Sequence, residues 1–139
     1  MPGIPANGAK YYQYHDAGIV YVKDHEKRTP YLSKAVADYE SALGFPLTTS
    51  YKYDAFYGLG TIKGDLGDFQ NVVVYLNEAI RIDSTSADIF FKRGCARNLL
   101  KDYPGALADY NKAIELNPKD SEAIRNRNMI LRNKSITLP

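Results

Sequence analysis

The sequence offers one thiol and two imidazoles for nucleophilic or acid–base chemistry. Cys95 is the single cysteine, and the two histidines are His15 and His25. Nucleophilic catalysis by cysteine needs an imidazole within hydrogen-bond reach of the thiol. His15 adjoins Asp16, but neighbouring residues on a helix point in different directions, so these two residues do not form a catalytic pair. One cysteine also cannot form an internal disulfide or a multi-thiolate metal site.

No further signature of catalysis or cofactor binding is present in the sequence. It lacks the HExxH, CxxC and GxSxG motifs, which would indicate a metalloprotease, a redox or metal site, or a serine hydrolase. Gly58, Gly60 and Gly64 lie within a stretch of helical periodicity, whereas a phosphate-binding loop connects a strand to a helix. We therefore predict no enzymatic activity, no cofactor and no metal. Cys95 is interpreted as a small residue at a helix contact.

Composition and charge narrow the class of protein. The chain has 139 residues, of which 45% are hydrophobic and 24% are charged, as expected for one soluble globular domain. No apolar run approaches the roughly 20 residues that span a bilayer, and the first residues contain no secretion signal. A net charge of +2 is too small to indicate a nucleic-acid surface. We expect a cytoplasmic protein that binds neither membranes nor nucleic acids.

The helices that must position any functional side chain follow from an internal repeat. Residues 87–120 align without a gap with residues 53–86, at an offset of 34 residues, and a longer, weaker copy lies upstream. The coinciding residues are Phe56 with Phe90, Gly60 with Gly94, Phe69 with Tyr103, and Ala79 with Ala113. Apolar and small residues recur at helical spacing within each copy, so each copy is predicted to form a pair of helices.

Turn-forming and capping residues delimit these helices. Pro118 ends one pair, and Asp68 and Asp102 are placed to cap the second helix of a pair, while Ser84 or Ser86 could cap the helix that follows. The predicted helices cover residues 9–24, 30–43, 52–65, 68–82, 86–100, 103–116 and 120–133.

The third copy carries the residues of a known repeat signature. They are Phe90, Gly94, Tyr103, Ala106, Tyr110, Ala113 and Pro118. Together with the period of 34 residues, they resemble the tetratricopeptide repeat, and the resemblance covers roughly residues 11–134. It implies an all-α fold, a right-handed α-solenoid of antiparallel helix pairs wound into a superhelix.

The resemblance also implies a domain organisation. The expected parts are an N-terminal tail over residues 1–9, one repeat domain over residues 10–134, and a tail over residues 135–139. Within the domain, the repeats cover about residues 11–52, 53–86 and 87–120, and a capping helix covers residues 121–134. The first repeat is longer because it contains a charged insertion over residues 23–30, which we interpret as a surface loop, with a partner contact as the alternative.

In the family, the first helix of each pair lines a concave groove that holds a partner. The resemblance therefore implies a scaffold or adaptor that binds a peptide or a helix of another protein. The groove residues carried over by repeat position are Tyr12, His15, Asp16, Ile19, Asp54, Tyr57, Gly58, Thr61, Asp88, Phe91, Lys92 and Cys95, and the cap adds Glu122, Arg125, Asn126 and Met129. Tyr57 and Phe91 are expected to be exposed, because a helix cannot bury them on the same face as their neighbours Phe56 and Phe90.

Gly58 and Gly64 exceed the glycines that the family pattern requires. Each lowers the stability of a helix by about 1 kcal/mol relative to alanine. Together they would leave bare backbone on the first helix of the second repeat, where a ligand chain could approach closely. Drift in a marginally stable helix is the alternative interpretation.

Some members of the family bind the acidic C-terminal tails of chaperones through a clamp of lysine, asparagine and arginine side chains. The clamp positions hold His15, Ile19, Gly58, Asp88 and Lys92 in one frame and Tyr57, Thr61, Lys92, Glu122 and Asn126 in the next. Neither frame provides more than one cation, so the sequence predicts that no EEVD-type tail binds.

Two further functions stay open at the level of the sequence. The ends of a solenoid can pair, which would make the chain a self-associating module and a homo-oligomer. The segment from Ser121 onward contains four basic residues (Arg125, Arg127, Arg132, Lys134) and one acid (Glu122), and could bind nucleic acid. The simpler interpretation is the solvated face of a capping helix.

Overall fold

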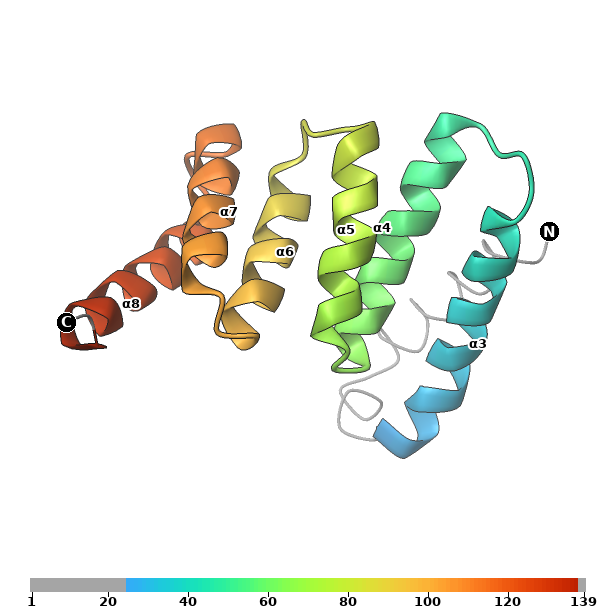
Figure 1. Cartoon of the computed structure of the whole chain (residues 1–139), viewed down its shortest axis with the longest axis horizontal. Helices are drawn as coiled ribbons and strands as arrows, with labels where there is room; N and C mark the ends of the chain where they lie inside the picture. Colours follow the sequence, from blue (N-terminus) through green and yellow to red (C-terminus); the bar gives the residue numbers. More distant parts are fainter. Residues whose placement is uncertain (1–24, 138–139) are drawn as a thin grey trace.

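The structure is a computed structural model that describes residues 25–137, with side chains described for residues 29–133. Six helices and no strand are found in this part of the chain. They are α3 (His25–Leu43), α4 (Thr49–Asp65), α5 (Phe69–Ile82), α6 (Ala87–Leu99), α7 (Tyr103–Leu116) and α8 (Ser121–Thr137). Figure 1 shows them stacked side by side in chain order, which confirms the predicted all-α solenoid. The predicted helix over residues 9–24, with Tyr12, His15 and Ile19, lies outside the described residues.

The helices associate in pairs, and the pairs stack. The most extensive contacts join α4 to α5 and α6 to α7, and smaller contacts join α5 to α6, α3 to α4, and α7 to α8. One apolar core runs from α5 to α8, and a second core joins α3 to α4 through Leu32, Val36, Leu59 and Ile62. No helix within residues 25–137 is long and apolar enough to cross a membrane.

Capping residues begin α5 and α7, the second helices of the two pairs within residues 49–116, as the sequence predicts. The carboxylate of Asp68 accepts a hydrogen bond from the backbone N–H of Asn71, and that of Asp102 accepts one from Gly105. Hydrogen bonds from the Asn71 side chain and backbone hold the pKa of Asp68 below its usual value. Ser86 occupies the cap position of α6, but its side chain makes no capping hydrogen bond. Ser86 therefore lies at the predicted cap position, but the predicted capping hydrogen bond is not formed.

The turn before each second helix has the same backbone geometry in both copies. Gly67 has a φ angle of 78°, and Lys101, which lies 34 residues later, has a φ angle of 64°. Glycine adopts this left-handed conformation without strain, whereas an L side chain pays about 1 kcal/mol. The third repeat thus keeps the left-handed turn although lysine stands where the second repeat has glycine.

Glycine allows the two helices of a pair to approach closely. A Cβ atom added at Gly60 would lie 2.5 Å from Leu76 Cδ2 and 2.8 Å from Leu76 Cγ, and Leu76 is fully buried. A Cβ atom at Gly94, one period later, would lie 3.0 Å from Tyr110 Cε1. The large side chain of the second helix therefore packs directly on the backbone of the first.

A buried ion pair joins the two helices of the third repeat, and one hydrogen bond extends it to the second repeat. Asp109 of α7 is 2% exposed, and its carboxylate accepts hydrogen bonds from Arg93 at 2.6 and 3.0 Å and from Arg97 at 2.9 Å. Arg93 also donates to Asn77 Oδ1 of α5 at 2.8 Å. The network joins α5, α6 and α7, and its carboxylate is well satisfied despite its burial.

The expectation of an inserted loop over residues 23–30 was wrong for its described part. The helix α3 already begins at His25, and Pro30 lies inside it. The sequence-based interpretation took Pro30 as the first turn of the helix, where proline is favoured. A proline further inside removes only one backbone hydrogen bond, and the preceding Glu26, Lys27 and Arg28 are good helix formers, so the helix extends toward the N-terminus.

Two substitutions within α4 test the close approach of the paired helices. Gly60→Ala should lower the free energy of unfolding by about 1–3 kcal/mol, because its methyl group overlaps Leu76. Gly64→Ala is the matched control: its Cβ would lie 3.7 Å from the nearest atom, Val72 Cγ2, so alanine should raise stability by about 0.5–1 kcal/mol. Urea denaturation followed by circular dichroism measures both. Equal effects of the two alanines would contradict the close approach.

Removal of the buried carboxylate tests the ion network. Asp109→Ala should lower the free energy of unfolding by about 3 kcal/mol, since Arg93 and Arg97 lose their shared partner. Glu115→Ala is the control, because it breaks the exposed pair of Glu115 with Lys112 and should cost at most about 1 kcal/mol. The same denaturation experiment applies. If both variants unfolded at the same urea concentration, the network would not hold the repeats together.

Candidate functional site

Two hollows follow one another along the first helices of the repeats. The first, here named the α4–α6 hollow, has a volume of about 200 Å³ and lies between α4, α5 and α6. Apolar side chains form most of its wall: Phe69, Val72, Phe91, Ala96 and Leu99. The backbone of Gly60 and Gly64 lines one side of it, and Thr61, Asp65, Lys92 and Cys95 complete the wall.

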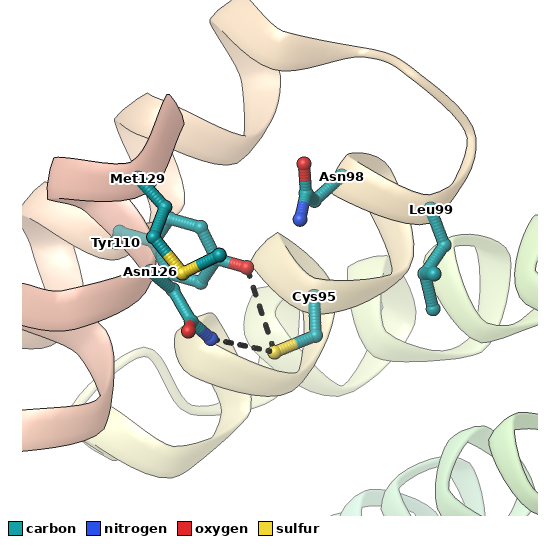
Figure 2. Close-up of a pocket in the computed structure, with 6 residues that line it drawn as sticks. All are labelled: Cys95, Asn98, Leu99, Tyr110, Asn126 and Met129. Atoms are coloured by element: carbon teal, nitrogen blue, oxygen red, sulfur yellow. Dashed lines mark hydrogen bonds between the residues drawn. The ribbon is translucent and has the colours of Figure 1, made fainter. Parts of the chain in front are cut away.

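The second hollow lies between α6, α7 and α8, and we name it the α6–α8 hollow. It has a volume of about 230 Å³, and Figure 2 shows its six lining residues, Cys95, Asn98, Leu99, Tyr110, Asn126 and Met129. Cys95 and Leu99 line both hollows. The two hollows are therefore adjacent parts of one groove, which we call the groove from here on.

Six of the residues predicted to line the groove do so. Thr61 of α4 and Phe91, Lys92 and Cys95 of α6 belong to the α4–α6 hollow, and Cys95 also lines the α6–α8 hollow together with Asn126 and Met129 of α8. The three residues of α6 lie there because positions three and four residues apart share one face of a helix. Gly58, Glu122 and Arg125 line neither hollow. The predicted residues on the first helix of the first repeat fall outside the described part of the chain.

Tyr57 and Asp88, two more of the predicted residues, form a polar cluster with Lys92 between α4 and α6. The hydroxyl of Tyr57 donates a hydrogen bond to the carboxylate of Asp88. Lys92 Nζ lies 3.6 Å from the same carboxylate and 5.7 Å from the centre of the Tyr57 ring. Asp54 is exposed on α4, one turn before Tyr57. The cluster places one positive and one negative charge, already paired, beside the α4–α6 hollow.

The expected exposure of Tyr57 and Phe91 was wrong, because both are half-buried. The Tyr57 ring stacks on Tyr53 with a centroid distance of 6.2 Å, and the Phe91 ring contacts Tyr110 at 5.9 Å. Both also pack against the apolar core. Neighbouring helices reach both faces of α4 and α6, so two adjacent aromatic residues can each find a contact.

The two extra glycines of α4 have different environments. A Cβ atom at Gly58 would lie 2.7 Å from Tyr39 Cζ, so the ring of Tyr39 from α3 covers this part of the backbone. The expected bare backbone is therefore absent at Gly58. At Gly64 the nearest atom would lie 3.7 Å away, and the backbone lines the α4–α6 hollow. Only Gly64 offers backbone that a ligand chain could approach.

Several lining residues were missed at the level of the sequence. Asn98 and Leu99 follow Cys95 by three and four residues, so they continue the same helical face. This spacing could have identified both residues from the sequence. They were missed because the groove positions of the family end at Cys95, one turn earlier. Phe69 and Tyr110 come from second helices, which the carried-over positions leave out. Their contribution depends on how the paired helices cross.

Burial disfavours ionisation of the polar groups at the base of the α6–α8 hollow. It raises the pKa of the Cys95 thiol above its ordinary value, and it raises the pKa of Tyr110 as well. The hydroxyl of Tyr110 donates to Cys95 Sγ at 3.6 Å, and Asn126 Nδ2 donates to it at 3.8 Å (Figure 2). No group of three or more potential metal ligands occurs within the described residues.

Known proteins share both the sequence pattern and the fold of this chain. The tetratricopeptide repeat model matches residues 53–86 and 87–120. A DnaJ protein P58IPK homolog B from Oryza sativa subsp. japonica is 32% identical over 90 residues, or 64% of this chain. The chain spans only 19% of the length of that relative.

Solved structures extend the likeness to nearly the whole chain. The first tetratricopeptide repeat domain of Spaghetti (RPAP3), bound to the HSP90 peptide SRMEEVD, has a TM-score of 0.71 at 17% identity and covers 96% of both chains. The second such domain of human RPAP3, in complex with the HSP70 peptide SGPTIEEVD, has a TM-score of 0.62 at 15% identity and covers 89% of this chain and 97% of that chain. At these identities the likeness concerns the fold.

The exclusion of a chaperone-type tail was wrong. It rested on the side chains at the clamp positions alone, yet two solved domains of the same fold are bound to peptides that end in EEVD. The fold of this chain is therefore one that holds an EEVD-type peptide in other proteins. The matched repeats, the helical stacking and these neighbours agree, and the chain belongs to the tetratricopeptide repeat family.

Proposed function

We propose that the chain is a scaffold or adaptor that binds a peptide or a helix of a partner protein in the groove. The observation that carries the proposal is the pair of adjoining hollows with apolar rims. Leu99 is 59% exposed and Met129 is 53% exposed at this rim. Large apolar side chains that stay exposed around a concavity are typical of an interaction site.

The charges around the groove suit a ligand that brings both apolar and polar groups. Lys92 is paired with Asp88 on its own helix and partly covered by Tyr57. A ligand could therefore compete for either charge at the entrance, while its apolar groups enter the hollows. Such an arrangement favours specificity for a partner, with affinity supplied by the apolar contacts.

The peptides seen in similar domains are candidate ligands of this groove. SRMEEVD and SGPTIEEVD each place a large aliphatic or methionine side chain directly before the EEVD sequence. The apolar walls of both hollows could accept a side chain of this kind. The cytoplasmic location, the self-association and the nucleic-acid binding considered from the sequence stay predictions.

The groove is proposed to be non-catalytic. A nucleophilic cysteine needs a depressed pKa and a basic neighbour. The pKa of the Cys95 thiol is raised by burial, and its hydrogen-bond partners are a phenol and an amide. The thiol therefore acts as a small packing group in the wall of the groove.

A charge exchange on α6 tests binding in the groove. Asp88→Lys combined with Lys92→Asp keeps an opposite pair four residues apart, so the helix should stay folded while the charge pattern of the groove is inverted. Proteins retained from a lysate of the source organism by the native chain should be retained at least about tenfold less by the variant, which corresponds to about 1.4 kcal/mol.

The matched control exchanges a pair outside the groove. Glu78→Arg with Arg81→Glu inverts an exposed pair on α5, whose atoms lie 3.0 Å apart, and should retain the same proteins as the native chain. Circular dichroism establishes that all three chains are equally folded. Retention of the same proteins by both exchanged variants would contradict binding in the groove.

The reactivity of Cys95 tests the absence of catalytic chemistry. Iodoacetamide should label the folded chain at pH 8 several-fold more slowly than the chain unfolded in urea, because burial keeps the thiol protonated. Labelling should accelerate as the pH rises above the ordinary pKa of a thiol. Faster labelling of the folded chain at pH 7 than of the unfolded chain would reveal an activated thiolate and overturn the interpretation.

A further inference from the structure

The α6–α8 hollow has an uncharged wall. Its lining side chains are a thiol, a phenol, two amides, a thioether and an isobutyl group, and none of them carries a formal charge at neutral pH. Lys92 and Arg125 are each paired with an acid on their own helix, Arg93 and Arg97 are paired with Asp109, and Arg127 donates to Asn128 Oδ1. A charged ligand group would lose its hydration here without gaining an opposite charge. The hollow therefore favours an uncharged group.

The rim of this hollow is apolar on two opposite sides. Leu99 at the end of α6 and Met129 on α8 are both more than half exposed, and Figure 2 shows them on different sides of the hollow with Cys95 between them. Methionine is flexible and polarisable, so it adapts to side chains of different shape. An aliphatic side chain placed between the two would bury apolar surface of both residues.

Two amides project into the same hollow from different helices. Within residues 29–133, the side chain of Asn98 makes no hydrogen bond, and Asn126 contacts only the sulfur of Cys95 at a long 3.8 Å and the phenol of Tyr110. A carboxamide carries one acceptor and two donors, which match the N–H and C=O groups of a peptide bond. Asn98 and Asn126 are therefore suited to hold the backbone of an extended chain.

We propose that the α6–α8 hollow is a subsite for one aliphatic side chain of an extended, uncharged stretch of a partner peptide. Leu99 and Met129 enclose the side chain, while Asn98 and Asn126 bind the peptide groups on either side of it. The inference rests on the proposed function, because it assigns a ligand chemistry to one part of the groove. The fit is to leucine, isoleucine or methionine, whose side chains fill the space between the two rims.

Disulfide capture at Cys95 tests the subsite without knowledge of the natural partner. The chain contains no other cysteine, so reversible exchange with a disulfide probe reports on this site alone. Each probe is the mixed disulfide of β-mercaptoethanol with N-acetyl-Cys-Gly-Leu-amide, or with the same peptide ending in alanine or aspartate. The Cys95 thiolate attacks the probe disulfide and releases β-mercaptoethanol, and added free β-mercaptoethanol keeps the exchange reversible. Intact-mass spectrometry measures the fraction of each adduct. The leucine adduct should exceed the alanine adduct at least about fivefold and the aspartate adduct by more.

Four variants test whether the preference belongs to the α6–α8 hollow. Met129→Ser should abolish the advantage of leucine, whereas Leu116→Ser, an exposed leucine of α7 that lines neither hollow, should preserve it. Gly64→Ala narrows only the α4–α6 hollow and should also preserve it. Asn98→Ala with Asn126→Ala should lower capture of all three probes alike.

Equal capture of the leucine and alanine probes by the native chain would overturn the subsite. A leucine preference that survives Met129→Ser, or one that disappears in Gly64→Ala, would overturn it as well. These results are separate from the proposed function. A chain that loses its partners on exchange of Asp88 and Lys92 but shows no leucine preference retains the function and loses only the subsite.

Discussion

The close approach of two helices at one glycine in each pair is the contact on which the remaining architecture depends. At Gly60 and Gly94 the backbone of the first helix lies directly against Leu76 and Tyr110 of the second. Because this contact recurs with the repeat period, successive pairs have the same internal geometry. The first helices then follow one another along a common face, and the groove forms on that face as a consequence of pair packing.

The buried carboxylate of Asp109 supplies a different kind of constraint. Apolar contacts are non-directional, whereas the paired guanidinium groups of Arg93 and Arg97 reach it only in one relative arrangement of α6 and α7. The further hydrogen bond from Arg93 to Asn77 extends this constraint to α5. Packing thus brings the repeats together, and the polar network specifies how the third repeat is oriented relative to the second.

Much of the fold could be predicted from the sequence, because its period and its capping residues are local signals. Helix ends from residue 49 onward lie within a few residues of their predicted positions, and Asp68 and Asp102 cap as expected. The contact of Tyr39 with Gly58 could not be predicted, since it joins helices across a connection of irregular length. Asn98 was missed because its place in the groove depends on where α8 crosses α6. Local sequence patterns therefore predict the helices, whereas the contacts between side chains of different helices depend on how those helices cross.

The wall formed by Cys95 and Leu99 belongs to both hollows, and this has a thermodynamic consequence for any ligand. A ligand side chain in one hollow would restrict the rotamers of Leu99 and thereby alter the shape of the other hollow. The binding contributions of two neighbouring ligand residues would then be coupled rather than additive. Preferences measured for one ligand position at a time would therefore fail to predict which pairs of residues bind best.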